Sequence, residues 1–450
     1  MRNIMINDLP PEILGLIFMS FHRDLKRGEV DIGLAAVCLT CKRWSDLALS
    51  TPELWSCIDI TFDPIPSALR ISNLPSYTKV FSWLDRSKNW PLALAVKGEG
   101  LNIRQSASLK AIFPLLIAHS HRWRRVSFRF GFWFRPIDVY LPHTFIAPIL
   151  ENLEMICDNN DDEIYVFYGR ILRGSPALQS YTHRGPHYIN SLSSDLPWKQ
   201  LRNLEVTDPT NAINALIWLG KAVNLHSYYI VIGPDDIRGK SLKPVTSPIE
   251  LLTMKIERGT RGLAHNAKEF FRFIDAKDLK KLSIHFVLGH SMVYDILSSI
   301  LLKPRLLLSS LTITNLATSE VEFLDCLKLL SDSSITTFEI LTQLEVPVYG
   351  YCEPVKNEIL NLLTFHGDGS PKTLCPLLET LTLELCVGAD DGLLTNMIRS
   401  RRHSPDTLRD HGIACLKRLD VVFFRSTHSL DEEGLKEIYG EGLRGCVKFK

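Results

Sequence analysis

The sequence predicts an α/β protein in which a three-helix N-terminal module precedes an irregular solenoid with a parallel sheet on its concave side. Three observations lead to this class. Apolar residues near the N-terminus recur at helical spacing, a short apolar strand pattern recurs from about residue 120 onward, and 450 residues exceed one ordinary core. We therefore expect a helical module at 1–60, a linker and transition segment at 61–120, and the solenoid at 121–450.

The first helix should begin at Pro10 and Pro11, because the missing N–H of proline would have no partner in the first helical turn. Apolar residues at helical spacing follow it, and Phe18 belongs to this face. Two further apolar stretches, at 34–38 and 44–48, predict the second and third helices. A module of this size buries too little apolar surface alone, so it should pack on a neighbour or a partner.

The successive motifs LPPEIL–IF, L–VC–W and TPELW resemble the F-box, over roughly residues 5–58. The resemblance implies a module that binds a Skp-type adaptor and, through the adaptor, a cullin scaffold. A charged stretch at 25–31 is longer than in the shortest F-boxes, which would loosen the docking geometry. The matching residues, which the resemblance assigns to adaptor binding, are Leu9, Pro10, Glu12, Ile13, Leu14, Ile17, Phe18, Leu34, Val37, Cys38, Trp44, Pro52 and Trp55.

A strand and a helix are expected before the solenoid. Leu92, Leu94 and Val96 alternate with smaller or polar residues, as in a half-buried strand, and 111–118 reads as a helix. The order of the motifs Trp-Leu-x-Arg-Ser, Pro-Leu-x-Leu and His-Ser-x-Arg-Trp is similar to that in a large group of F-box proteins from basidiomycete fungi.

Arginine and aromatic residues are interleaved in 122–135. This composition suits either a clamp for single-stranded nucleic acid or a half-buried strand with its arginines toward solvent. The alternation of Val126, Phe128 and Phe130 with polar residues favours the strand.

An apolar-x-x-apolar-x-apolar pattern recurs through the remaining chain, mostly at the 20–29-residue spacing of leucine-rich repeats. The copies resemble degenerate leucine-rich repeats, and most lack the usual Asn after the strand, so regular curvature is not expected. Each copy must stack on its neighbours to bury its apolar face, and a plain α/β domain is the alternative. The copies begin at Trp123, Leu150, Leu178, Leu201, Leu225, Leu251, Leu279, Leu308, Ile335, Leu378 and Leu416.

Residues between and after the strand anchors should point to the concave face. Most of the charged residues at these positions are acidic, which predicts a face that captures a basic segment of a client protein. Alternatively, acidic side chains merely keep an exposed sheet soluble. The predicted client-binding residues are Glu154, Glu205, Lys255, Glu257, His285, Glu339, Glu384 and Asp420.

The charge balance argues against nucleic acid or an anionic membrane as the main partner. The chain has 51 Lys and Arg against 50 Asp and Glu, a net charge of +1. No apolar run reaches the ~18 residues of a membrane span, and we identify no signal peptide. We therefore expect a location in the cytoplasm, the nucleus or both.

Two local motifs have ordinary alternatives. Cys38 and Cys41 have CxxC spacing, but no second pair follows, so packing in a small core is favoured over a zinc site. The basic run at 398–410, which contains Ser404-Pro405, suits an import signal or a phosphorylation site, although a solvated loop is favoured.

The sequence contains no nucleophile elbow, phosphate-binding loop, dinucleotide fingerprint or zinc-protease motif. We expect no catalytic residues, no metal and no cofactor. With the F-box resemblance, this predicts a non-enzymatic substrate-recognition subunit of an SCF-type ubiquitin ligase, which presents a client protein on its repeats. An F-box scaffold that binds the adaptor outside a ligase is the alternative.

Overall fold

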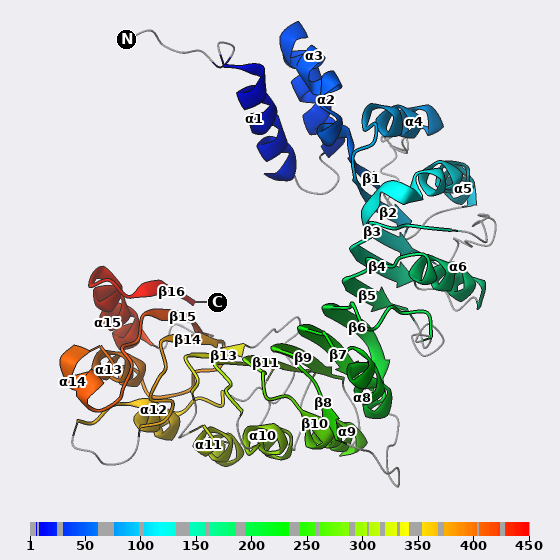
Figure 1. Cartoon of the computed structure of the whole chain (residues 1–450). Helices are drawn as coiled ribbons and strands as arrows, with labels where there is room; N and C mark the ends of the chain where they lie inside the picture. The colour runs from blue at the N-terminus through cyan, green and yellow to red at the C-terminus, as the bar shows by residue number, and fades with distance from the viewer. Residues whose placement is uncertain are drawn as a thin grey trace, which may run out of the picture. The chain divides into compact units, whose positions relative to one another are not determined.

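The computed structural model divides into two compact units, Met1–Asp208 and Pro209–Lys450 (Figure 1). The residues that the structure describes are 6, 9–24, 30–61, 76–98, 103–131, 145–157, 162–185, 194–233, 244–257, 261–287, 293–303, 306–315, 320–330, 334–341, 353–367, 373–402, 405–423 and 428–449.

The first unit opens with helices that lead through a short 3₁₀ helix, η2, into parallel strands in the order β1-β2-β3-β4-β5-β6. Helices α4, α5 and α6 flank one side of these strands (Figure 1). The elements are α1 (Pro11–Asp24), α2 (Val30–Thr40), α3 (Lys42–Ser50), η2 (Pro52–Trp55), β1 (Cys57–Thr61), α4 (Tyr77–Arg86), β2 (Leu92–Gly98), α5 (Ile103–Ala118), η3 (Ser120–Arg122), β3 (Trp123–Phe130), β4 (Asn152–Cys157), α6 (Asp162–Arg173), β5 (Ser180–Arg184) and β6 (Asn203–Thr210).

In the second unit, parallel strands follow in the order β7-β9-β11-β12-β13-β14-β15-β16, and β8 pairs with β10 separately. The strands are β7 (Ser227–Ile232), β8 (Val245–Thr246), β9 (Leu251–Ile256), β10 (Ile274–Asp275), β11 (Lys281–Phe286), β12 (Ser310–Thr314), β13 (Thr337–Leu341), β14 (Thr380–Glu384), β15 (Arg418–Phe423) and β16 (Arg444–Phe449). The helices are α8 (Ala212–Lys221), α9 (Arg261–Phe273), α10 (Val293–Leu301), α11 (Glu320–Lys328), α12 (Asn357–Leu363), α13 (Leu393–Ser400), α14 (Pro405–Asp410) and α15 (Ser429–Gly440).

Consecutive repeats are joined through one main-chain carbonyl just before each strand. The carbonyl of Glu250 accepts hydrogen bonds from the N–H groups of Lys280 and Lys281, at 2.9 and 3.0 Å. This pairing locks each strand in register beside the one before it. The predicted α/β class with a parallel sheet is therefore confirmed. The same double acceptance occurs at the carbonyls of Glu151, Gln179, His226, Lys280, Ser309, Thr336 and Glu379.

Each strand buries one face and leaves the other partly open. In β2, Leu92, Leu94 and Val96 are at most 3% exposed, whereas Ala93 and Ala95 are only half-buried. The predicted strand at 92–96 is confirmed. Because side chains alternate between faces, the helices cover the first set and leave the second as an open sheet face.

One predicted repeat anchor is wrong by two residues. Leu251 lies on the open face, where it pairs with Ser227, and the buried anchor is Ile249, which is fully buried. A last repeat, which the apolar pattern did not predict, follows these anchors: Leu443 is buried just before β16. The other anchors, from Trp123 to Leu416, are buried as predicted.

The segment assigned to a linker and transition contains regular structure. Residues 76–98 form α4 and β2, and residues 103–118 form α5. Strand β2 pairs with β1 on one side and β3 on the other, so this segment contributes a full strand to the sheet of the first unit.

The arginine-rich aromatic segment forms strand β3, as the alternation predicted. Val126, Phe128 and Phe130 are at most 3% exposed, and the rings of Phe128 and Phe130 stack at 5.5 Å between centroids. These aromatic rings are in the core and are not available to stack on bases. Residues 132–135 lie outside the described residues.

Strand β5 carries a buried histidine, His183, on the covered face of the sheet in the first unit. His183 is 1% exposed, and its Nδ1 lies 3.1 Å from the hydroxyl of Tyr181. Its Nε2 lies 3.8 Å from Asp208, which is beyond hydrogen-bonding distance. Burial lowers the pKa of His183 from 6.5 to about 4, so the imidazole is neutral at neutral pH.

We predict that acid selectively destabilises the first unit through His183. Its folded-state pKa of about 4 lies below the unfolded value of 6.5, so its contribution is complete above pH 6.5 and is lost as the pH falls toward 4. The loss should reach about 3 kcal/mol. Urea unfolding at several pH values should show a shallower pH dependence for His183→Asn than for the wild type. Replacement of the exposed His121 by Asn should leave the pH dependence unchanged, and equal slopes for all three proteins would contradict the assignment.

Candidate functional site

Helix α1 has two apolar faces. Leu14 and Phe18 are 0% and 3% exposed, and they pack into the N-terminal module. On the adjoining side of the helix, Ile13, Leu16 and Ile17 are 43%, 58% and 38% exposed, so three neighbouring large apolar side chains meet solvent. Because exposed apolar patches mark interaction sites, this stripe is a candidate docking surface.

The inner faces of the three helices hold the module together and connect it to the rest of its unit. The rings of Phe18 and Trp44 lie 5.0 Å apart, and the indole N–H of Trp55 donates to the carbonyl of Ala48 at 2.8 Å. The guanidinium of Arg86, from α4, lies 4.5 Å from the centre of the Trp55 ring. Trp55 therefore contacts both the helical module and the first helix beyond it.

The structure separates the thirteen predicted adaptor-binding residues into three groups. The core residues are Leu14, Phe18, Leu34, Val37 and Trp55; the exposed ones are Pro10, Glu12, Ile13 and Ile17; and Leu9, Cys38, Trp44 and Pro52 are partly buried. Sequence matching could not make this separation, because large apolar residues occur in all three groups. It also missed the exposed Leu16, Leu39 and Leu49 on the three helices.

The CxxC pair has no surrounding metal ligands among the described residues. Cys38 and Cys41 are free and partly buried. Burial raises the pKa of the Cys38 thiol, and the positive charge of Arg86 only partly opposes this effect. Partial burial of both thiols fits the interpretation that they pack in a small core.

On the open sheet face of the first unit, both predicted client-binding acids have partners. Glu154 accepts hydrogen bonds from Ser127 at 2.5 Å and from Arg129 at 2.7 Å. Glu205 accepts one from Thr182, on the neighbouring strand, at 3.3 Å. Hydroxyl and carboxylate side chains thus alternate across adjacent strands. The negative charge of the carboxylates is partly compensated by these donors within the sheet.

The same pairing occurs on the open face of the second unit. Glu339 accepts a hydrogen bond from Thr312 at 2.8 Å, and Asp420 pairs with Arg418 at 2.6 Å. Burial and the charge of Lys255, its neighbour in register, lower the pKa of His285. Glu384 lies on β14, and Glu257 follows β9 directly.

The open faces carry charges of both signs, which differs from the acidic face that the sequence pattern predicted. The positions chosen from the sequence pattern left out several basic residues that lie on the same faces. These basic residues are Lys97, Arg125, Arg129 and Arg184 in the first unit, and Lys281, Arg418, Arg444 and Lys448 beside Lys255 in the second.

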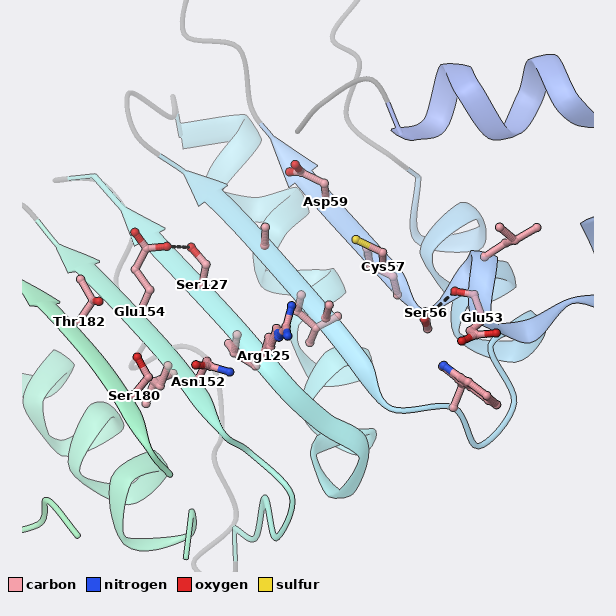
Figure 2. A pocket seen from close by; sticks show the side chains of 18 of the residues that line it. Glu53, Ser56, Cys57, Asp59, Arg125, Ser127, Asn152, Glu154, Ser180 and Thr182 are labelled. Carbon is pink, nitrogen blue, oxygen red and sulfur yellow. Dashed lines mark hydrogen bonds between the residues drawn. The ribbon is translucent and has the colours of Figure 1, made fainter. Parts of the chain in front are cut away.

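A groove of about 570 Å³ lies on the open face of β1–β5 in the first unit (Figure 2). Its floor includes Ala93 and Ala95 of β2, whose small side chains leave space between the larger residues of β1 and β3. Glu53 of η2 and the exposed Trp90 line it as well. The volume is within the range of about 300–1,000 Å³ that is usual for ligand-binding sites.

The basic run near the C-terminus is mostly structural, so the predicted solvated loop is wrong for residues 398–402. Arg399 pairs with Glu437 at 2.7 Å. Arg401 is completely buried and donates to the carbonyls of Leu363 and Cys375 at 2.7 and 3.0 Å, and also to that of Leu374. Burial lowers its pKa to about 10, so it remains charged at neutral pH. Ser404 lies outside the described residues.

One cluster of potential metal ligands occurs among the residues that the structure describes. Ligand atoms of Asp391, His428 and Asp431 lie within 4.8 Å of one another. However, Asp391 accepts the N–H groups of Leu430 and Asp431 at 2.9 Å each, and Asp431 accepts that of Thr395 at 2.8 Å. Burial raises the pKa of Asp391. The hydrogen bonds that Asp391 accepts from the backbone of Leu430 and Asp431 outweigh burial, so the pKa is lowered overall. The cluster therefore caps helix α15.

Comparison with known families supports the module defined by α1–β1. Residues 6–61 match the F-box-like family model, whose boundaries enclose all thirteen predicted adaptor residues. Comparison with curated proteins found no match. In the described part of the chain, no helix is both long and apolar enough to cross a membrane. The F-box-like domain supports a role in protein–protein interaction.

We predict that Arg401→Lys destabilises the second unit by at least about 2 kcal/mol, because one ammonium cannot reach the carbonyls that the guanidinium binds. Arg399→Lys, in the exposed pair with Glu437, should change stability by no more than about 1 kcal/mol. Chemical unfolding of the two variants makes the comparison. Equal effects would indicate that the buried contacts of Arg401 contribute nothing beyond its charge.

Proposed function

We propose that this protein is a substrate-recognition subunit of an SCF-type ubiquitin ligase. The observation that carries the proposal is the exposed stripe of Ile13, Leu16 and Ile17 within the F-box-like match. A Skp-type adaptor would cover this stripe, since F-box domains generally bind such adaptors. The adaptor in turn would bind a cullin scaffold, and the repeats, of a degenerate leucine-rich type, would present a client protein.

The role is one of positioning, without chemistry on this chain. The open sheet faces offer rows of polar side chains in fixed register, and we propose that a client binds there. Holding a client near a charged ubiquitin-conjugating enzyme converts a bimolecular encounter into an effectively intramolecular one. The reaction would take place on other subunits, in the cytoplasm or the nucleus.

The continuity between F-box and sheet supports this role. Strand β1 begins two residues after η2 ends, and it pairs along its length with β2. Within the first unit, the docking helices and the first strands of the open face therefore share one chain segment and one core. A client on those strands would be held at a defined distance from the adaptor.

We predict that replacing Ile13 and Ile17 together by Ala abolishes adaptor binding and lowers the melting temperature less than Leu14→Ala does. Both side chains are partly exposed, so their loss removes interface contacts and disturbs the core less than loss of a fully buried residue. Truncation of central interface anchors typically costs about 2 kcal/mol or more, which is about thirtyfold or more in Kd. Leu9→Ala with Pro10→Ala should also abolish binding.

Leu14→Ala is the matched control, since this neighbouring residue is fully buried and should lose about 2–5 kcal/mol of folding stability. Binding is measured by pull-down of a Skp-type adaptor and a cullin with the full chain. Recovery of the adaptor without the cullin would favour the scaffold alternative. Failure of the wild type to bind the adaptor would contradict the proposal.

A further inference from the structure

The groove on β1–β5 contains an acidic oxygen without a hydrogen-bond partner. Oδ1 of Asp59 accepts a hydrogen bond from Thr61 at 2.6 Å, whereas Oδ2 is buried and has no partner among the described residues. A desolvated carboxylate oxygen without a donor is unfavourable. The half-buried carboxylate of Asp59 lines the groove, and the single hydrogen bond from Thr61 only partly offsets its negative charge, so a cationic group of a bound molecule would pair with it.

Arg125 provides the opposite charge in the same groove. It is exposed on β3, and it has no ion-pair or hydrogen-bond partner within the described part of the chain. The remaining strong charge on the floor, Glu154, is already bonded to Ser127 and Arg129. Asp59 and Arg125 are thus the two charged groups of the floor that a bound molecule could pair with.

The strand register sets the distance between these two groups. Asp59 lies opposite Ala95, and Arg125 lies opposite Ala93, so the two positions differ by two strands and by two residues along them. Standard spacings within a sheet place their Cα atoms about 12 Å apart. An extended peptide rises about 3.3 Å per residue, so it covers this distance in three or four residues.

We propose that the groove binds an extended client segment that carries a basic residue against Asp59 and an acidic residue against Arg125, three or four positions apart. This inference rests on the proposed function as a client receptor and specifies the class of client. Small or unbranched side chains fit above Ala93 and Ala95.

Synthetic peptides test this inference with the full chain. Fluorescent decapeptides in a Gly-Ser-Ala background carry one Lys and one Glu, in either order and at every separation from one to six positions. Peptides with only Lys, only Glu, or several Lys complete the set. Fluorescence anisotropy should show tightest binding for the mixed pair at a separation of three or four.

Variants assign each charge of the peptide to one side chain. Asp59→Asn keeps an acceptor for Thr61 and should weaken Lys-containing peptides about tenfold, with little effect on Glu-only peptides. Arg125→Ala should weaken Glu-containing peptides about two- to fivefold. Arg184→Ala removes an exposed arginine from the same sheet face outside the groove, and it should change nothing.

A steric variant keeps the test decisive if a charge variant does not fold. Ala95→Leu fills the floor of the groove without altering its charge, and it should weaken all mixed-charge peptides. Equal binding of all peptides, preference for the several-Lys peptide, or insensitivity to both Asp59→Asn and Ala95→Leu would overturn the inference. Adaptor binding is measured on the same preparations: its absence in the wild type would contradict the ligase role, whereas intact adaptor binding without peptide preference would contradict only the groove assignment.

Discussion

The carbonyl that accepts two N–H groups from the next repeat is the interaction on which the rest of the structure depends. A strand–helix unit of this length cannot bury its apolar face alone, so each one is stable only against its neighbours. The carbonyl of Glu250, bonded to Lys280 and Lys281, shows how that stacking is held in register. Any slip by one residue would turn the buried anchors toward solvent.

Register also creates the open sheet faces on which client binding is proposed. Because every strand presents its alternate residues to the same open face, side chains far apart in sequence form rows, such as Asp59, Ala95, Ser127 and Glu154. Ala93 and Ala95, two small residues of β2, leave the space that forms the groove. Asp59 and Arg125 supply charges there. The same constraint that stabilises the sheet therefore places the groups that would recognise a client.

Much of the fold followed from periodicity, and the errors have physical causes. The repeat at Leu251 was misplaced because Ile249, Leu251 and Leu252 are all apolar, and only pairing with Ser227 shows which face each one takes. The buried Arg401 lies in a run of basic residues that resembles solvent-exposed sequence. Its burial depends on carbonyls from distant segments, Leu363 and Cys375, which composition cannot reveal.

The sequence by itself determined the class of fold, the F-box-like module and most of the buried anchors, because apolar spacing records which side of an element faces a core. Tertiary structure alone decided which apolar residues of α1 stay exposed, since Ile13 and Leu14 are chemically alike and differ only in what covers them. It also decided that the open faces carry mixed charge and that Asp59 and Arg125 share one groove. Those relations arise from strand register, which joins residues far apart along the chain.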